Sequence, residues 1–237
     1  MINKKTILTT KINKEWYKKY MIKAVIFDMD GLLLDTEILY QNAWIEYGKI
    51  YNYDISAHFL TTIRGKNAEN IEKFCKEKFG WDFDFLKAST FCYTQILKYS
   101  DAGEINIKNG VVELLDYLKK ENYKIGLATS SNRSMGERIL KKANLLKYFD
   151  VKVYGDMVEN SKPNPDIFLL AVDKLKVMSK ECVVLEDSAN GILAAHAANC
   201  VTALVPDIDQ PLQSTINKSN YVLENVAQLI NVLKNVF

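Results

Sequence analysis

The sequence is poor in the residues that build thiolate metal sites, disulfide frameworks or histidine-centred catalysis. Its 237 residues include four cysteines, two histidines and four prolines. The cysteines are scattered with no CxxC pair, so we expect reduced, partly buried thiols and neither a zinc ribbon nor a disulfide scaffold. His58 and His196 are far apart in the sequence, which argues against a zinc site built on histidine.

A strong charge of one sign and a long apolar run are also missing. The formal net charge is +2, with 48% hydrophobic and 25% charged residues, a composition typical of soluble globular proteins. This balance gives no basis for nucleic-acid binding, and no apolar run reaches the length of about 20 residues that spans a bilayer. We therefore expect a cytoplasmic protein with no nucleic-acid or membrane partner, and a monomer by default.

Residues 1–20 differ from the rest of the chain. They carry six lysines against one acidic residue, Glu15. A secretory signal needs an apolar core of about 7–15 residues, which this stretch lacks. We interpret 1–20 as a lysine-rich extension that precedes the folded part.

The stretch around which the chain is organised runs from Ala24 to Gly31. Four apolar residues, too few for a helix, predict a strand buried on both faces. They end in Asp28 and Asp30, and Gly31 then permits a tight turn out of the strand. Taken alone, the two aspartates are either a solvated acidic turn or a cation site.

The remaining chain alternates short apolar runs with amphipathic segments. Further strands are predicted at 123–128, 151–154, 182–185 and 201–205, and helices at 110–121, 167–175 and 189–199, with others after 132 and near the C-terminus. This order predicts a doubly wound (Rossmann-like) parallel α/β sheet. Residues 38 to about 100 show helical spacing, interrupted at Gly80-Trp81-Asp82, and no strand-like alternation. We therefore expect 37–104 to be an all-helical insertion into a core formed by 21–36 and 105–237.

Polar residues follow several of these predicted strands. Thr129 and Ser130 end the second strand, Glu186 and Asp187 end the fourth, and Lys162 precedes a helix. Because the carboxyl ends of parallel strands share one edge of the sheet, these residues are expected near Asp28 and Asp30.

Their chemistry suits phosphoryl transfer. Carboxylates of Asp28, Glu186 and Asp187 are hard oxygen ligands of the kind that Mg²⁺ prefers. Thr129 and Lys162 supply a hydroxyl donor and a cation for phosphate oxygens. Each group also has a simpler interpretation: Thr129-Ser130 and Glu186-Asp187-Ser188 as helix caps, and Lys162 as a surface lysine.

Together these motifs resemble those of the haloacid dehalogenase superfamily, over nearly all of 21–237. They are DMDGLLLDTE at 28–37, Thr129 in LATSS, Lys162 in SKPNPDIF and Glu186-Asp187 in VLEDSANG. The resemblance implies a nucleophile, Asp28, and a general acid/base, Asp30, whose backbone carbonyl also touches Mg²⁺. By the same resemblance Glu186 and Asp187 complete the metal site, and Thr129, the Ser130 backbone and Lys162 bind phosphate.

The resemblance also implies a role for the helical insertion and a class of substrate. Residues 37–104 are similar to the family's mobile cap, in which Arg64 matches a substrate-contacting loop. The subgroup implied is that of β-phosphoglucomutases and pseudouridine-5′-phosphatases. The expected activity is Mg²⁺-dependent hydrolysis of a small phosphorylated metabolite, a sugar phosphate or a nucleoside 5′-monophosphate such as pseudouridine 5′-phosphate, through an aspartyl-phosphate.

Two alternatives stay open at this stage. The first is a phosphosugar mutase. Tyr40 and Ala68 argue against it, because they occupy the positions where mutases carry a histidine and an arginine. The second is a non-catalytic phospho-ligand binding protein on the same fold. That alternative would require the loss of a catalytic group, and every motif residue is present.

Overall fold

The computed structural model describes residues 21–63, 68–208 and 210–236. The chain divides into two compact units: the sheet unit, which holds the described residues up to Leu34 and from Ile107 onward, and the helical unit, Asp35–Asn106. The lysine-rich extension at 1–20 and the loop that contains Arg64 lie outside the described residues.

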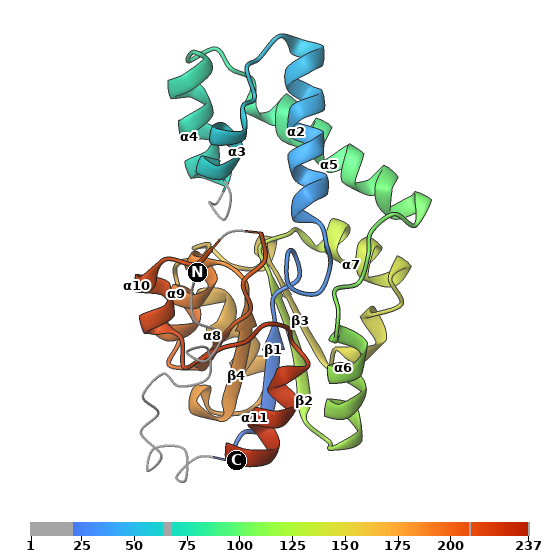
Figure 1. Ribbon diagram of the computed structural model, residues 1–237, viewed down its shortest axis with the longest axis vertical. Coiled ribbons are helices and arrows are strands. Elements are labelled where there is room, and N and C mark those ends of the chain that lie inside the picture. The colour runs from blue at the N-terminus through green and yellow to red at the C-terminus, as the bar shows by residue number, and fades with distance from the viewer. Residues whose placement is uncertain (1–20, 64–67, 209, 237) are drawn as a thin grey trace. The chain divides into compact units, whose positions relative to one another are not determined.

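The sheet unit is built on six parallel strands in the order β3-β2-β1-β4-β5-β6 (Figure 1). The strands are β1 (Ala24–Phe27), β2 (Lys124–Thr129), β3 (Val151–Tyr154), β4 (Cys182–Glu186), β5 (Val201–Leu204) and β6 (Tyr221–Val222). Every strand expected from the sequence is present. The two-residue β6 was not expected, because a segment that short has no readable alternation.

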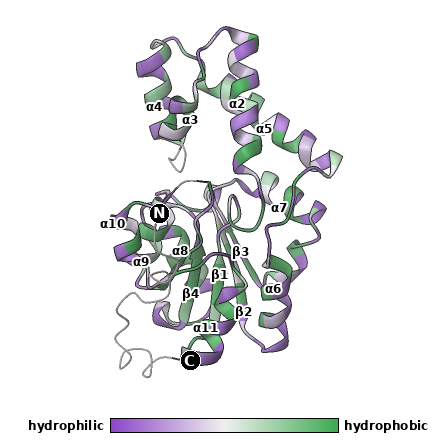
Figure 2. Ribbon diagram, in the orientation of Figure 1, coloured by the Kyte–Doolittle hydropathy of each residue, from purple (hydrophilic) through white to green (hydrophobic). Residues whose placement is uncertain are grey.

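Helices cover both faces of this sheet, so the predicted doubly wound architecture is confirmed. They are α6 (Val111–Lys120), α7 (Arg133–Lys142), α8 (Asp166–Leu175), α9 (Ala189–Ala197), α10 (Gln213–Lys218) and α11 (Gln228–Val236), with 3₁₀ turns at Leu146–Tyr148, Gly155–Met157 and Ser179–Glu181. Figure 2 shows apolar strands inside and polar residues on the outward helix surfaces.

Strand β1 explains why its sequence has no alternation. Ala24 and Ile26 pack in a cluster with residues of α8 and α9 on one face. Side chains of a strand alternate between faces, so Val25 and Phe27 point to the other face, where the Phe27 ring meets Phe149 edge-on. All four side chains are fully buried. A strand sandwiched in this way fixes the position of the aspartates that follow it.

The helical unit contains α2 (Glu37–Tyr51), α3 (Ala57–Ile63), α4 (Ala68–Phe79) and α5 (Phe85–Ala102). Its described residues include no strand, in agreement with the predicted helical insertion. The Asp84 side chain accepts from Lys87 N at 2.9 Å and begins α5. The core of this unit is aromatic, with Trp44, Tyr47 and Phe59 at its centre.

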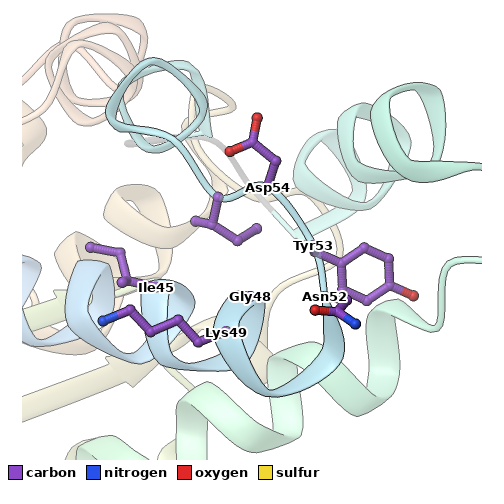
Figure 3. A pocket seen from close by; sticks show the side chains of 7 residues that line it. Ile45, Gly48, Lys49, Asn52, Tyr53 and Asp54 are labelled. Atoms are coloured by element: carbon purple, nitrogen blue, oxygen red, sulfur yellow. The ribbon is translucent and has the colours of Figure 1, made fainter.

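A close approach of the chain to α2 depends on Gly48. Tyr53 N donates to Gly48 O at 2.9 Å, which folds the 52–55 segment back onto the helix. A β-carbon at position 48 would lie 2.7 Å from Tyr53 O and would overlap Ile55. The same residues, with Lys49 and Asp54 at the rim, line a pocket of about 460 Å³ on this unit (Figure 3).

Phe59→Ala tests the aromatic core of the helical unit. Phe59 is fully buried and its ring contacts those of Trp44, Phe74 and Phe79. Truncation is expected to lower the free energy of unfolding by about 3–5 kcal/mol, because it removes aromatic contacts and leaves a cavity. Trp81→Ala, at a residue that is 77% exposed, is the control and should change stability by less than about 0.5 kcal/mol in denaturant titration. Equal losses for the two variants would contradict this assignment of the core.

All four cysteines are buried free thiols, and burial raises the pKa of Cys75 and of Cys92 to about 12, which keeps both thiols unreactive. Among the described helices, none combines the length and the apolar composition that a membrane crossing requires.

Candidate active site

The exits of three neighbouring strands meet at the centre of the sheet edge. Strand β1 lies between β2 and β4, and Phe27 is in register with both Leu127 and Leu185. Asp28 N donates to Leu185 O at 3.1 Å and so continues the ladder. Strands β2 and β3 lie on one side of β1, and β4, β5 and β6 lie on the other. The strand order therefore reverses here, and ligands of open α/β sheets bind at such a switch point.

Lys162 is the cation at this edge. Its Nζ donates to Asp28 Oδ1 at 2.6 Å, to Glu186 Oε1 at 2.7 Å and to Ala128 O at 3.1 Å. The side chain is only 6% exposed and its ammonium lies 4.9 Å from the centre of the Phe168 ring. These contacts exclude the interpretation of Lys162 as an ordinary surface lysine.

The charges in this cluster do not balance. Burial raises the pKa of Asp28 to about 8, with Glu186 and Asp30 adding to the rise and Lys162 opposing it. Burial also disfavours the charged form of Lys162, but the carboxylates of Asp28 and Glu186 outweigh that effect and raise its pKa. One ammonium thus faces more than one buried carboxylate, and the excess charge favours a proton or a cation.

The donor set fits a hard divalent cation. Asp28, Glu186 and Asp187 each offer a carboxylate oxygen, and these atoms lie within 4.8 Å of one another. Oxygen ligands close together, with an excess of negative charge, suit Mg²⁺. Glu186 is held rigidly, because its Oε2 accepts from Ser188 N at 3.0 Å and Ser188 Oγ at 2.9 Å. Ser188 in turn caps α9 through Gly191 N, so the cap interpretation applies to Ser188 rather than to the two acids.

Asp30 lies against the hydroxyl groups that follow β2. Its Oδ2 accepts from Ser131 Oγ at 2.8 Å and, at the outer limit of hydrogen bonding, from Thr129 Oγ1 at 3.5 Å. Thr129 is fully buried, whereas Ser130 beside it is exposed. Asn132 caps α7 by accepting from Met135 N at 3.0 Å, which excludes Thr129-Ser130 as that cap.

Ser131 was not among the residues singled out in the sequence. Three hydroxyl residues follow one another in Thr129-Ser130-Ser131, and nothing in their order says which of them faces Asp30. The signal that could have found Ser131 is the turn: its N–H donates to Thr129 Oγ1 at 3.1 Å, an ST-turn that brings position 131 back toward the strand end.

Comparison with known proteins gives a consistent result. The family model described as haloacid dehalogenase-like hydrolase matches residues 25–205. A phosphorylated carbohydrates phosphatase of Thermotoga maritima is 33% identical over 91% of this chain and all of its own length. Fructose-1-phosphate phosphatase of Escherichia coli is 32% identical over 77% of this chain and 94% of its own.

A solved structure shows the same likeness in three dimensions. β-Phosphoglucomutase from Clostridium difficile aligns with a TM-score of 0.76 at 25% identity, over 91% of this chain and 97% of its own. The family match covers most of the chain and includes every strand exit described above. This chain therefore belongs to the haloacid dehalogenase-like hydrolases.

Proposed function

We propose that this hydrolase is a Mg²⁺-dependent phosphatase of a small phosphorylated metabolite and works through an aspartyl-phosphate on Asp28. The substrate would be a sugar phosphate or a nucleoside 5′-monophosphate such as pseudouridine 5′-phosphate. The observation that carries the proposal is the buried contact of Lys162 Nζ with both Asp28 and Glu186. A buried cation, the carboxylate of the proposed nucleophile and oxygen atoms suited to a metal lie around one point, which supports the proposal.

In the first step an Asp28 carboxylate oxygen attacks phosphorus and the bond from phosphorus to the ester oxygen breaks. Asp30 gives its proton to the departing oxygen, so the product leaves as a neutral alcohol. The Ser131 hydroxyl, 2.8 Å from Asp30 Oδ2, keeps that carboxyl in one orientation. Thr129, the Ser130 backbone and Lys162 bind the phosphoryl oxygens.

In the second step water replaces Asp28 on phosphorus. Asp30, now ionised, takes a proton from the water as its oxygen attacks, the bond from Asp28 to phosphorus breaks, and inorganic phosphate leaves. Splitting one slow displacement into two is the benefit of covalent catalysis. Lys162 stabilises negative charge in both halves because its ammonium is already fixed in a buried position.

The metal would be held by Asp28, the Asp30 carbonyl, Glu186 and Asp187. When bound, Mg²⁺ supplies the positive charge that keeps Asp28 ionised and neutralises phosphate oxygens. Burial raises the pKa of Asp28 to about 8 even beside Lys162, and a protonated carboxyl is a poor nucleophile, so a further cation at this point would favour the reactive form. The three carboxylate oxygens lie within 4.8 Å of one another, which supports this assignment.

We further propose that the helical unit, Asp35–Asn106, acts as a cap that selects the substrate and excludes water from the reaction. Arg64 remains a predicted substrate contact. Its role is best tested by Arg64→Ala, which should raise KM for the true substrate while leaving hydrolysis of p-nitrophenyl phosphate nearly unchanged.

Phosphate release from a substrate panel tests the proposed function. The panel contains sugar phosphates, nucleotides, pseudouridine 5′-phosphate, glycerol phosphate and p-nitrophenyl phosphate. We expect Mg²⁺-dependent release from at least one of the metabolites and a fall to background in excess EDTA, because no divalent cation then neutralises the carboxylates and the phosphate oxygens. Restored activity on adding back Mg²⁺ is the control for irreversible damage. Turnover that persists in EDTA would contradict the metal requirement, and binding of phosphate esters without turnover would favour the non-catalytic alternative.

A phosphosugar mutase is the second candidate, favoured by the structural likeness to β-phosphoglucomutase. It requires the phosphoryl group to return to a second hydroxyl of the sugar instead of to water. Interconversion of β-glucose 1-phosphate and glucose 6-phosphate without net phosphate release would establish it. Tyr40 and Ala68 stand where the sequence comparison expects the mutase histidine and arginine, so we expect hydrolysis to dominate.

A further inference from the structure

A partly buried ion pair lies beside the carboxylate cluster and takes no part in the reaction proposed above. The Lys108 ammonium contacts Oδ1 of Asp207, and the two side chains are 24% and 11% exposed. Lys108 N donates to Leu33 O at 3.0 Å, and Val205 N donates to Glu186 O at 2.8 Å. Both partners are thus attached by the main chain to the segments that carry the site.

The second oxygen of Asp207, Oδ2, lies close to the position that a β-carbon on Gly31 would take, and so does Oδ2 of Asp187. Oδ2 is buried and has no hydrogen-bond partner within the described residues. A β-carbon on Gly31 would lie 3.2 Å from this oxygen and would overlap Oδ2 of Asp187. Gly31 has φ +77°, a conformation that glycine adopts freely. The absence of a side chain there lets the carboxylates of Asp187 and Asp207 approach the same face of the loop.

A buried carboxylate oxygen needs a hydrogen-bond donor, and Asp187 cannot be that donor when it is ionised. Asp207 is also not one of the three carboxylates whose oxygens lie within 4.8 Å of one another. It is therefore too far out to join them as a direct ligand of the same ion. Magnesium usually keeps several water molecules when it binds to protein carboxylates. The O–H groups of these water molecules point away from the ion and can donate hydrogen bonds to nearby acceptors.

We propose that Asp207 is a positioning residue, whose Oδ2 accepts a hydrogen bond from a water molecule bound to the metal at Asp28, Glu186 and Asp187. Lys108 neutralises the other oxygen, so that the added carboxylate does not leave a further uncompensated charge. This inference rests on the metal requirement of the proposed function. Residues that hydrogen-bond to metal-bound groups typically change metal affinity by about 10- to 100-fold when replaced.

Calorimetric titration of Mg²⁺ into the metal-free full chain, without substrate, tests the inference. Asp207→Asn is expected to raise the Kd for Mg²⁺ about tenfold, because the amide presents donors where the water needs an acceptor. Lys108→Met keeps the acceptor and removes a positive charge, so its Kd should stay equal to that of the wild type or fall. Asp150→Asn also removes a lysine-paired carboxylate, in this case the partner of Lys119. As the control it should leave the Kd unchanged.

The two variants, Asp207→Asn and Lys108→Met, are expected to change the Kd for Mg²⁺ differently, and this difference distinguishes a positioning role from a purely structural one. If the pair merely holds the fold, Asp207→Asn and Lys108→Met weaken Mg²⁺ binding together and lower the thermal midpoint together, which would overturn the inference. A Kd for Asp207→Asn within twofold of the wild-type value would also overturn it. If the wild-type chain binds no Mg²⁺, the metal requirement of the proposed function fails as well, whereas normal wild-type binding with unaffected variants removes this inference alone.

Discussion

Asp28→Asn is expected to lower phosphatase turnover by on the order of 10⁴- to 10⁶-fold, as removal of a nucleophile does in other covalent enzymes. The amide cannot attack phosphorus and offers one neutral oxygen to a cation. Because Asp28 Oδ1 lies 2.6 Å from Lys162 Nζ, the variant also loses the ion pair between these two side chains. Turnover of the best substrate from the panel, with saturating Mg²⁺, is the measurement.

Asp30→Asn is the matched variant, since it replaces the neighbouring aspartate with the same amide. It leaves the nucleophile in place but removes the group that protonates the leaving oxygen and deprotonates water. We expect a smaller fall in turnover, of about 10²- to 10⁴-fold, and accumulation of phosphorylated protein, detectable as an added phosphoryl mass on Asp28. Substantial activity in Asp28→Asn, or a phosphoryl group on another residue, would contradict the assigned nucleophile.

The sheet could be predicted from the sequence because each strand of four or more residues is an apolar run that polar residues follow. Ala24–Phe27 is buried on both faces, and burial of that kind requires the continuous apolar stretch seen in the sequence. Strand exits of a parallel sheet share one edge, so the placement of Thr129 and Glu186 beside Asp28 followed from topology. The shortest elements gave the weakest sequence patterns: β6 has two residues and α10 has six.

Contacts between side chains could not be read in the same way. Lys162 was expected near phosphate, yet its simultaneous contact with Asp28 and Glu186 joins residues that are 134 and 24 positions apart. Asp207 and Lys108 are 99 positions apart, and each alone resembles an ordinary surface charge. Such pairs depend on the exact course of loops, for which sequence periodicity carries no information.

Replacement of the buried Lys162 is the second change that we expect to have a large effect on turnover. Lys162→Met keeps most of the side-chain volume and the contact with Phe168, but it leaves Asp28 and Glu186 without their shared cation. We expect turnover to fall by about 10²- to 10³-fold, the usual cost of losing one fixed electrostatic stabiliser of the transition state. Loss of one partner from a buried ion pair should also reduce the free energy of unfolding by about 3–5 kcal/mol.

The pH dependence of that stability loss identifies its cause. Without Lys162 the pKa of Asp28 rises further above its wild-type value of about 8, because the cation that opposes the effect of burial is gone. A folded-state pKa raised above the unfolded value of 3.8 gives stability that is present at low pH and lost as pH rises toward the folded-state pKa. Below about pH 8 the Asp28 carboxyl is protonated in both folded chains, so metal-free Lys162→Met should be closer to the wild type in urea denaturation at pH 5 than at pH 9. A loss that is equal at both pH values would point to packing rather than uncompensated charge, and Phe168→Leu, which perturbs packing around Lys162 without changing charge, provides that comparison.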